Sequence, residues 1–154
     1  MNLNDPLIAT YGVAAGLMIL KMMGQGWMTV ARMMKAEGGF VNPEDQTRGW
    51  TNPNPKPGQI APNEYVERSR RMHHNDVENI PAFLVAGLLF VLTDPPLWLA
   101  AGLLWGYVIS RLAHFWAYLS AKSHETRATF WTIGSFIVIA MAGYSVVMAI
   151  AYLV

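Results

Sequence analysis

Residues 128–154, with the sequence ATFWTIGSFIVIAMAGYSVVMAIAYLV, form an apolar run that contains no charged side chain. A helix that crosses the hydrocarbon core of a bilayer needs about 20 apolar residues, so this run is long enough to span one. The whole chain has the same character, because 53% of its 154 residues are hydrophobic and only 14% are charged. A soluble domain of this composition would expose far too much apolar surface. We therefore expect an integral membrane protein.

Three more helices are expected before this run. Spans are predicted at residues 7–34, 66–92, 97–121 and 128–154, and these four spans together with their connections nearly exhaust the chain. The predicted fold class is an all-α membrane protein, a four-transmembrane-helix up-and-down bundle in one domain covering residues 1–154. The first helix is expected to be retained, because no basic leader or clear cleavage site accompanies it. The spacing Gly12-x-x-x-Gly16 would allow a close helix contact on one of its faces.

The segment 37–65 interrupts the helical pattern with paired glycines and a series of prolines, so it is predicted to be a loop. A loop of this length is typically functional or mobile. Most of the charged residues lie in three places, which are this loop, the polar start of the second span and residues 122–127. These regions share one side of the membrane, which the positive-inside rule identifies as the cytoplasmic side. Both termini would then face the opposite compartment.

Composition also limits the chemistry. The chain has no cysteine, so disulfides and a thiol nucleophile of its own are excluded, and any thiol must come from a ligand. A net charge of +1 gives no reason to expect a nucleic acid partner. No metal is expected, because no HExxH-like spacing occurs and the adjacent His73 and His74 would point in different directions on a helix.

The first half of the second span contains polar residues at helical spacing. Arg71, His74 or Asn75, and Glu78 would share one face and offer a cation, an amide and a carboxylate within about two turns. Such a face complements a zwitterionic peptide, with Arg71 binding a carboxylate and Glu78 accepting from an amine. The spacing is equally compatible with a structural role, in which these groups pair with one another inside the bundle.

A second polar set lies on the third span, where Arg111, His114 and Tyr118 share one face. Arg111 lies in an apolar stretch, so it must face protein rather than lipid, and Glu78 or Asp76 is its expected counter-charge. Taken alone, His114 is more typical of a hydrogen-bonded core histidine, and Tyr118 of an interfacial aromatic.

Arg127 precedes the last span at the predicted cytoplasmic surface. A guanidinium there can lower the pKa of a bound thiol by favouring the thiolate, and one pKa unit corresponds to about 1.4 kcal/mol. Taken alone, Arg127 is more typical of a side chain that anchors a helix at the membrane surface.

In combination these residues resemble a known family, the membrane-associated proteins in eicosanoid and glutathione metabolism (MAPEG), and in particular its microsomal glutathione transferase and prostaglandin E synthase branches. The resemblance runs from the first helix to the start of the fourth. The motifs that support it are Phe40-Val41-Asn42-Pro43-Glu44-Asp45, Val66-Glu67-Arg68, Arg71, Asn75-Asp76, Glu78-Asn79-Ile80, Arg111, His114, Ala117-Tyr118-Leu119 and Arg127.

The resemblance implies a homotrimer that binds glutathione as a cosubstrate, without a metal, at each subunit interface near the cytoplasmic side. Arg127 would stabilise the glutathione thiolate, with Asp45 close to it as a second catalytic residue. The residues that the resemblance implies as glutathione contacts are Arg32, Arg71, His74, Asn75, Glu78, Arg111, His114 and Tyr118.

Three positions depart from the prostaglandin synthase pattern. Ala128 stands where that enzyme has serine, Trp131 where a tyrosine or phenylalanine is expected, and His74 where it has arginine. These departures favour general conjugation over prostaglandin synthesis. A histidine is also a weaker and pH-dependent partner for a carboxylate than an arginine.

The resemblance implies a glutathione-dependent membrane transferase or peroxidase. The thiolate of glutathione would attack a hydrophobic electrophile or reduce a lipid hydroperoxide, while the protein supplies positioning and electrostatic stabilisation. The alternatives are a glutathione-dependent prostaglandin E synthase and a non-catalytic lipid-binding scaffold. The host membrane is either the endoplasmic reticulum or a bacterial inner membrane, and the proline-rich part of the loop, residues 46–65, has no assigned role.

Overall fold

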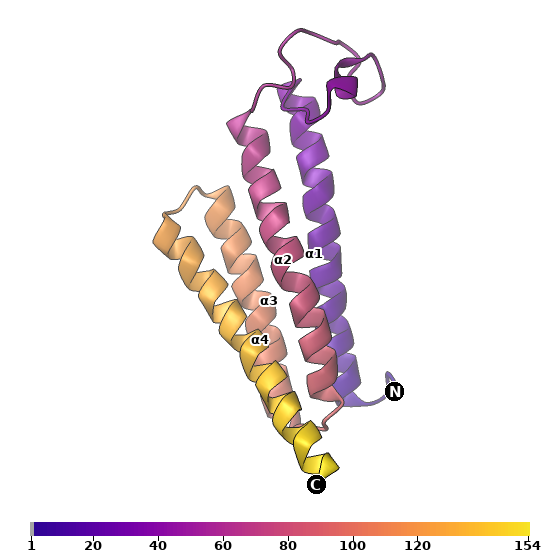
Figure 1. Cartoon of the computed structure of the whole chain (residues 1–154), viewed down its shortest axis with the longest axis vertical. Helices are drawn as coiled ribbons and strands as arrows, with labels where there is room; N and C mark the ends of the chain where they lie inside the picture. Colours follow the sequence, from indigo (N-terminus) through magenta and orange to yellow (C-terminus); the bar gives the residue numbers. More distant parts are fainter. Residues whose placement is uncertain (1) are drawn as a thin grey trace. The chain divides into compact units, whose positions relative to one another are not determined.

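The computed structural model describes residues 2–154, which form four α-helices and no strand. The helices are α1 (Pro6–Ala36), α2 (Glu64–Val91), α3 (Leu97–Leu119) and α4 (His124–Leu153), and a short 3-10 helix, η1 (Pro43–Gln46), lies between α1 and α2 (Figure 1). The predicted all-α, four-helix fold is confirmed.

The start of α4 differs from the prediction, in which the last span began at residue 128 and Arg127 preceded it. In the structure α4 begins at His124, and the Ser123 hydroxyl accepts a hydrogen bond from the backbone amide of Thr126 at 3.3 Å. A serine in this position satisfies one of the amides that have no partner within the first turn of a helix. Arg127 therefore lies in the first turn of α4, not in a loop before it.

Two helices, α1 and α4, are long and apolar enough to cross a membrane by length and composition. Only 22% of the apolar stretch of α1 and 11% of that of α4 is buried within the chain. The central helix of a soluble protein would be mostly buried, whereas a helix that faces lipid leaves its apolar side chains on the outside. Both helices therefore have the surface expected of membrane helices.

The contacts divide the chain into two compact units. The four-helix unit comprises residues up to Leu20 and Val77–Val154, and the loop unit comprises Lys21–Asp76. The boundary in α2 lies one turn before Pro81, which stays inside the helix. A proline has no amide hydrogen, so the helix loses one hydrogen bond at this point.

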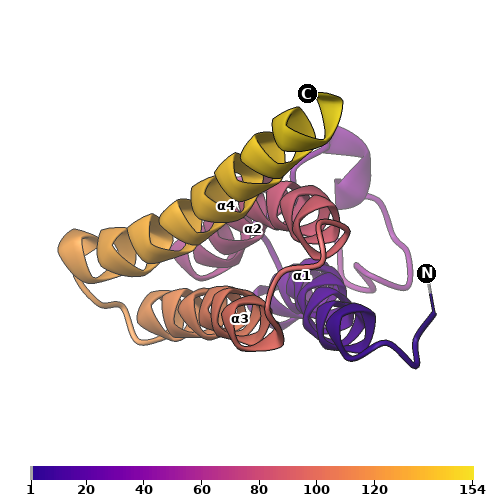
Figure 2. The same ribbon diagram turned by 90° about the horizontal axis from the view of Figure 1, so that it is seen from below.

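In the four-helix unit, the start of α1, the second half of α2, α3 and α4 run antiparallel in succession (Figure 1). Figure 2 shows the short turn that joins α3 to α4 at one end of this unit. Aromatic rings connect its helices, with Phe83 stacked on Tyr107 at 4.0 Å and Phe90 edge-on to Tyr144 at 5.2 Å between ring centroids. This aromatic core joins α2 to both α3 and α4.

Two glycines allow close approach in this unit. A Cβ atom on Gly87 would lie 3.1 Å from the Tyr11 ring, and one on Gly134 would lie 3.0 Å from the Ser110 hydroxyl. The predicted pair behaves differently, because a Cβ atom on Gly16 would meet nothing within 4 Å and one on Gly12 only a Leu3 side chain at 3.7 Å. Within the described chain, Gly12 and Gly16 therefore do not form the close helix contact that their spacing predicts.

The loop unit contains the second half of α1, the loop 37–63 and the first half of α2. Two buried amides hold the loop together, because Asn52 Nδ2 donates to Gln59 Oε1 at 2.8 Å and Gln59 Nε2 donates to Asn52 Oδ1 at 3.2 Å. Gln59 also connects the loop to the end of α1, since its Nε2 donates to the Glu37 carbonyl at 3.1 Å. The loop is therefore folded around a small polar core of its own.

Candidate functional site

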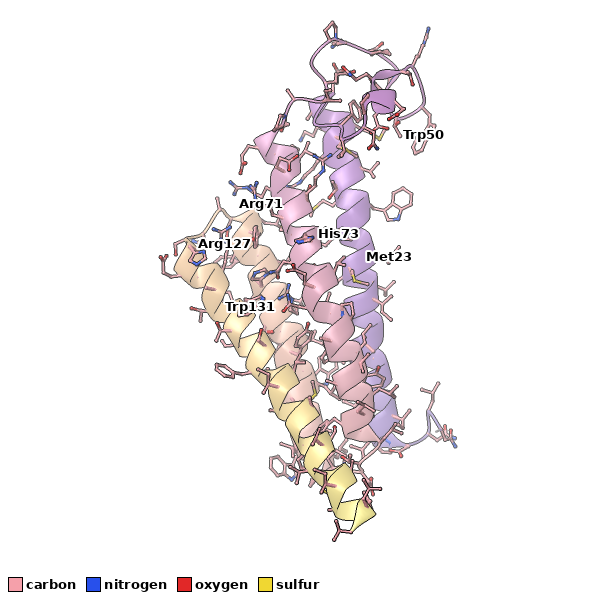
Figure 3. All side chains as sticks on the ribbon, viewed as in Figure 1. Met23, Trp50, Arg71, His73, Arg127 and Trp131 are labelled. Atoms are coloured by element: carbon pink, nitrogen blue, oxygen red, sulfur yellow. The ribbon has the colours of Figure 1, made fainter. Side chains whose placement is uncertain are left out.

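The first half of α2 has two faces of opposite character. Arg71 and His74 are exposed and Asn75 is half-buried, and in Figure 3 the Arg71 side chain extends from the side of α2 that faces away from α1. Glu78, one turn further and within the four-helix unit, is exposed as well. The opposite face packs into the loop unit through its buried residues, Val66, Ser69, Met72 and Asp76. The predicted peptide-binding face is thus turned away from the core of the loop unit. A ligand can reach Arg71 on this exposed face.

Arg71 already has a carboxylate partner. Its Nη2 donates to Glu64 Oε1 at 2.6 Å, and this hydrogen bond lowers the pKa of the Glu64 carboxyl. The Arg68 guanidinium lies 3.5 Å from the same oxygen. Glu64 is the counter-ion that sequence reasoning missed, although it lies two turns before Arg71 on the same face of α2.

Three predicted residues meet at one end of the four-helix unit. The ring of Tyr118 is edge-on to that of His114, with centroids 5.1 Å apart. The Arg127 guanidinium lies over the ring of Tyr118, with its Cζ 4.7 Å from the ring centroid. His114 is buried and Tyr118 is half-buried, so packing restricts the ring on which the Arg127 guanidinium lies. We refer to His114, Tyr118 and Arg127 as the arginine cluster.

The first turn of α4 favours negative charge. The pKa of Glu125 is lowered by hydrogen bonds from its own backbone amide and from the Ser123 hydroxyl. These donors belong to the amino-terminal end of a helix, where the backbone dipoles also attract anions. Arg127 lies in the same turn, and its Nε donates to the Ser123 carbonyl at 3.4 Å. A guanidinium and the amino-terminal end of a helix thus lie in the same turn.

Arg111 is only 1% exposed and is among the largest fully buried side chains of the chain. It is shielded by protein, as its position in an apolar helix requires. Asp76, one of its two predicted counter-charges, accepts hydrogen bonds in the loop unit from Lys21 Nζ and from Gln25 Nε2, the latter at 2.9 Å. Lys21 and Gln25 are one turn apart in an otherwise apolar stretch, and this spacing was the signal that sequence reasoning left unused.

Arg32 and Asp45 both have contacts inside the loop unit. Arg32 Nη1 donates to the Tyr65 carbonyl at 3.0 Å, and its Cζ lies 4.5 Å from the Tyr65 ring centroid, so Arg32 ties α1 to the start of α2. Asp45 is exposed and accepts from the Asn42 amide at 3.2 Å across η1. These contacts give both residues structural roles, and their predicted contacts with glutathione and with Arg127 stay predictions.

The chain matches the MAPEG family over residues 11–147. It belongs to this family. Because the MAPEG fold is a membrane bundle, the apolar outer surfaces of α1 and α4 belong to a membrane protein.

Relatives within MAPEG differ in the reactions that their names describe. Microsomal glutathione S-transferase 1 of Bos taurus is 38% identical over 67% of this chain and 66% of the relative. The human protein of the same name is 31% identical over 91% of this chain and 89% of its own length. Human prostaglandin E synthase is 27% identical over 85% of this chain and 82% of its own length. These relatives share the family of this chain, whereas the reactions in their names differ.

Two departures of this MAPEG chain from the prostaglandin synthase pattern follow Arg127 in α4. Ala128 is half-buried and adds no polar group to the turn. Trp131 lies one turn after Arg127 on the same side of the helix and is 42% exposed (Figure 3). The guanidinium therefore has a flat apolar surface beside it, which suits an aromatic or otherwise apolar second substrate.

A cavity of about 100 Å³ lies in the loop unit and is lined by Met34, Glu37, Phe40, Thr51, Asn52, Pro53 and Asn54. Pockets that enclose small organic ligands usually measure about 300–1,000 Å³. This cavity is too small for a tripeptide, and none of the predicted glutathione contacts lines it. It belongs to the packing of the loop.

Proposed function

We propose that this chain is a glutathione-dependent membrane transferase. Membership of MAPEG and the similarity to microsomal glutathione S-transferase 1 over most of the chain support this assignment. The observation on which it mainly rests is the arginine cluster, in which a guanidinium is held against Tyr118 at the amino-terminal end of α4. Since the chain has no cysteine, a thiol reaction at this place must use the sulfur of a substrate.

The proposed reaction begins with loss of the thiol proton of glutathione to solvent. Arg127 and the first turn of α4 favour the resulting thiolate, because both stabilise negative charge. The sulfur lone pair then attacks an electrophilic carbon, a carbon–sulfur bond forms, and the leaving group departs with the electrons of its former bond. The protein contributes orientation and electrostatic stabilisation, and the nucleophile belongs to the substrate.

The peptide part of glutathione is proposed to bind the exposed face of α2. Arg71 would hold a carboxylate, Glu78 would accept from the ammonium group, and His74 and Asn75 would contact the peptide between them. The exposure of Arg71, His74 and Glu78 supports this proposal. Arg111 and Arg32 are proposed as further contacts and Asp45 as the partner of Arg127, as the family resemblance implies.

The proposed assembly is a homotrimer whose protomers cross the membrane four times, with the loop on the cytoplasmic side. The membrane is the endoplasmic reticulum or a bacterial inner membrane. The exposed apolar side chains along α1 and α4 support an environment of lipid and neighbouring protomers.

Conjugation is proposed over two other reactions of the same site. Ala128 and Trp131 place an alanine and an indole beside Arg127, which favours a bulky apolar electrophile over a prostaglandin endoperoxide. Reduction of lipid hydroperoxides by the same thiolate is a second candidate, because it needs the same activated sulfur. Supplying each substrate with glutathione and identifying the product separates the three reactions.

The test uses purified protein with glutathione and chlorodinitrobenzene. Wild type should form the conjugate, and Arg127→Ala should lower kcat/KM on the order of a hundredfold, because an electrostatic contact with the reacting atom is lost. Lys122→Ala is the matched control, since Lys122 Nζ also lies over a ring, that of Trp116 at 5.1 Å, in the same turn region. Unchanged turnover in Arg127→Ala would remove Arg127 from the mechanism.

A non-catalytic scaffold is separated from an enzyme by binding. A protein that binds glutathione only in its folded state gains stability as the ligand concentration rises above the Kd. The melting temperature in detergent should therefore increase with glutathione, and a scaffold without the site would show no increase.

A further inference from the structure

The first two turns of α2 contain an ion pair on the face proposed to bind the peptide. Glu64 and Arg71 are seven residues apart, and Arg71 Nη2 donates to Glu64 Oε1 at 2.6 Å. Residues two turns apart lie above one another on a helix. The Glu64 carboxylate thus binds the Arg71 guanidinium, which in the proposed function binds a carboxylate of glutathione.

This pair is open to solvent. The Arg71 side chain is 48% exposed and that of Glu64 is 68% exposed. An ion pair exposed to this extent gains little from its Coulomb attraction and restricts two long side chains. Incoming solutes can therefore replace either partner without unfolding α2.

We propose that Glu64 is a built-in competitor for the carboxylate site at Arg71, which it occupies in the ligand-free protein and leaves when a carboxylate of glutathione binds. This inference rests on the proposed function, because it concerns the same guanidinium. It adds a residue that sets the affinity of the site without touching the bound ligand.

The exchange has a consequence for selectivity. When a ligand carboxylate replaces Glu64, Arg71 stays paired throughout, and Glu64 keeps the nearby Arg68 as a partner at 3.5 Å. A ligand with a neutral group in the same place would leave Arg71 without a counter-charge, because a neutral acceptor makes a weaker hydrogen bond than a carboxylate and brings no negative charge. Glu64 therefore selects for anionic ligands and lowers their affinity by a modest factor.

Glu67 offers a matched control. It lies one turn after Glu64 in the same part of α2 and pairs with Arg70, which also donates to the Gly39 carbonyl. A glutamate-to-glutamine change at either position removes the same charge from the start of the helix. Only the change at Glu64 releases Arg71.

The experiment measures the Kd for glutathione in detergent for wild type, Glu64→Gln, Glu67→Gln, Arg71→Gln and the Glu64→Gln/Arg71→Gln double variant. Glu64→Gln should bind glutathione roughly two- to fivefold more tightly, the range expected for an exposed ion pair. Glu67→Gln should match wild type, and Glu64→Gln should have no effect in the Arg71→Gln background. Melting temperatures of all variants check that the helix is intact.

Three results would overturn the inference: an unchanged or weaker affinity in Glu64→Gln, an equal gain in Glu67→Gln, or a gain that persists without Arg71. In each case wild type still binds glutathione, so the proposed function stands. If wild type itself binds no glutathione, the proposed function fails and the inference fails with it.

Discussion

Tyr118 decides how Arg127 is held. The guanidinium lies on the ring of Tyr118, and the ring in turn rests edge-on against the buried His114. A cation over an aromatic face is attracted by the ring itself, so the hydroxyl group is not needed for this contact. The role of Tyr118 can therefore be divided into ring and hydroxyl by substitution.

Tyr118→Phe should keep conjugation within about threefold of wild type, because the ring that supports Arg127 remains. Tyr118→Leu removes the ring and should lower kcat/KM about tenfold, the effect expected when a reacting group loses its positioning. Steady-state kinetics of both variants with chlorodinitrobenzene measure the difference. Equal losses in the two variants would show that the hydroxyl itself contacts the thiol, which contradicts a purely supporting role.

At the scale of elements, a buried polar network joins α1 to α2 in the loop unit. Asp76 is 1% exposed and accepts from Lys21 and Gln25 of α1. The network points Asp76 toward α1, and because α2 is a rigid helix, Arg71 and His74 must then point to the opposite side. The orientation of the proposed binding face thus depends on residues that would not touch the ligand.

Lys21→Met should destabilise the protein by about 3 kcal/mol, because it removes a cationic donor from the buried Asp76 carboxylate. The double variant Lys21→Met/Asp76→Asn should be more stable than Lys21→Met, because the buried charge is gone as well. Chemical or thermal unfolding in detergent measures both. Lys35→Met, an exposed lysine of the same helix, is the control and should change little. If the double variant is no more stable than Lys21→Met, the buried Asp76 charge is not the cause of the loss.

The loop 37–63 depends on one amide pair. Gln59→Leu removes the bonds to Asn52 and to the Glu37 carbonyl, and the buried Asn52 Oδ1 loses its donor while Asn52 Nδ2 keeps its bond to the Asp45 carbonyl, so we expect a cost of about 1–3 kcal/mol. The loop should open locally, so trypsin should cleave after the exposed Arg48 more quickly than in wild type. Gln46→Ala, a half-buried residue of η1, is the control. Cleavage at the wild-type rate in Gln59→Leu would show that the amide pair does not hold the loop.

At the scale of the whole molecule, the four-helix unit depends on close packing at particular glycines. The ring of Tyr11 lies against Gly87, and the Tyr11 hydroxyl donates to the Leu84 carbonyl at 2.8 Å, so α1 and α2 are joined side by side. Gly134 lets α4 approach α3 at Ser110 in the same way. In lipid, where apolar surface gives no driving force between helices, such close contacts contribute directly to stability.

Gly134→Ala should lower stability by about 1–3 kcal/mol, because its methyl group would lie 3.0 Å from the Ser110 hydroxyl and force the two helices apart. Gly143→Ala, in the same helix, would meet nothing within 4 Å and should be neutral or stabilising by up to about 1 kcal/mol through helix propensity. Melting temperatures in detergent compare the two. Equal losses would show that helix propensity or lipid contacts, not close packing, dominate.

The amino-acid sequence by itself determined the all-α fold and the chemistry of each helix face. Long apolar runs separated by prolines and glycines leave few alternatives to membrane helices, and helical periodicity assigns Arg71 and Glu78, or His114 and Tyr118, to a common face. These properties are local, because they follow from the covalent order of residues within one helix. The Ser123 cap is local in the same way, because serine four residues before Arg127 is a signal for the start of a helix.

Only the tertiary structure decided which groups meet. It paired Asp76 with Lys21 and Gln25, placed the close contacts at Gly87 and Gly134 instead of Gly12 and Gly16, and laid Arg127 on Tyr118. Each of these contacts joins different helices, so it depends on their rotation and approach, which are set by the packing of many side chains together. The spacing of residues along one helix contains no information about the partner that the next helix presents.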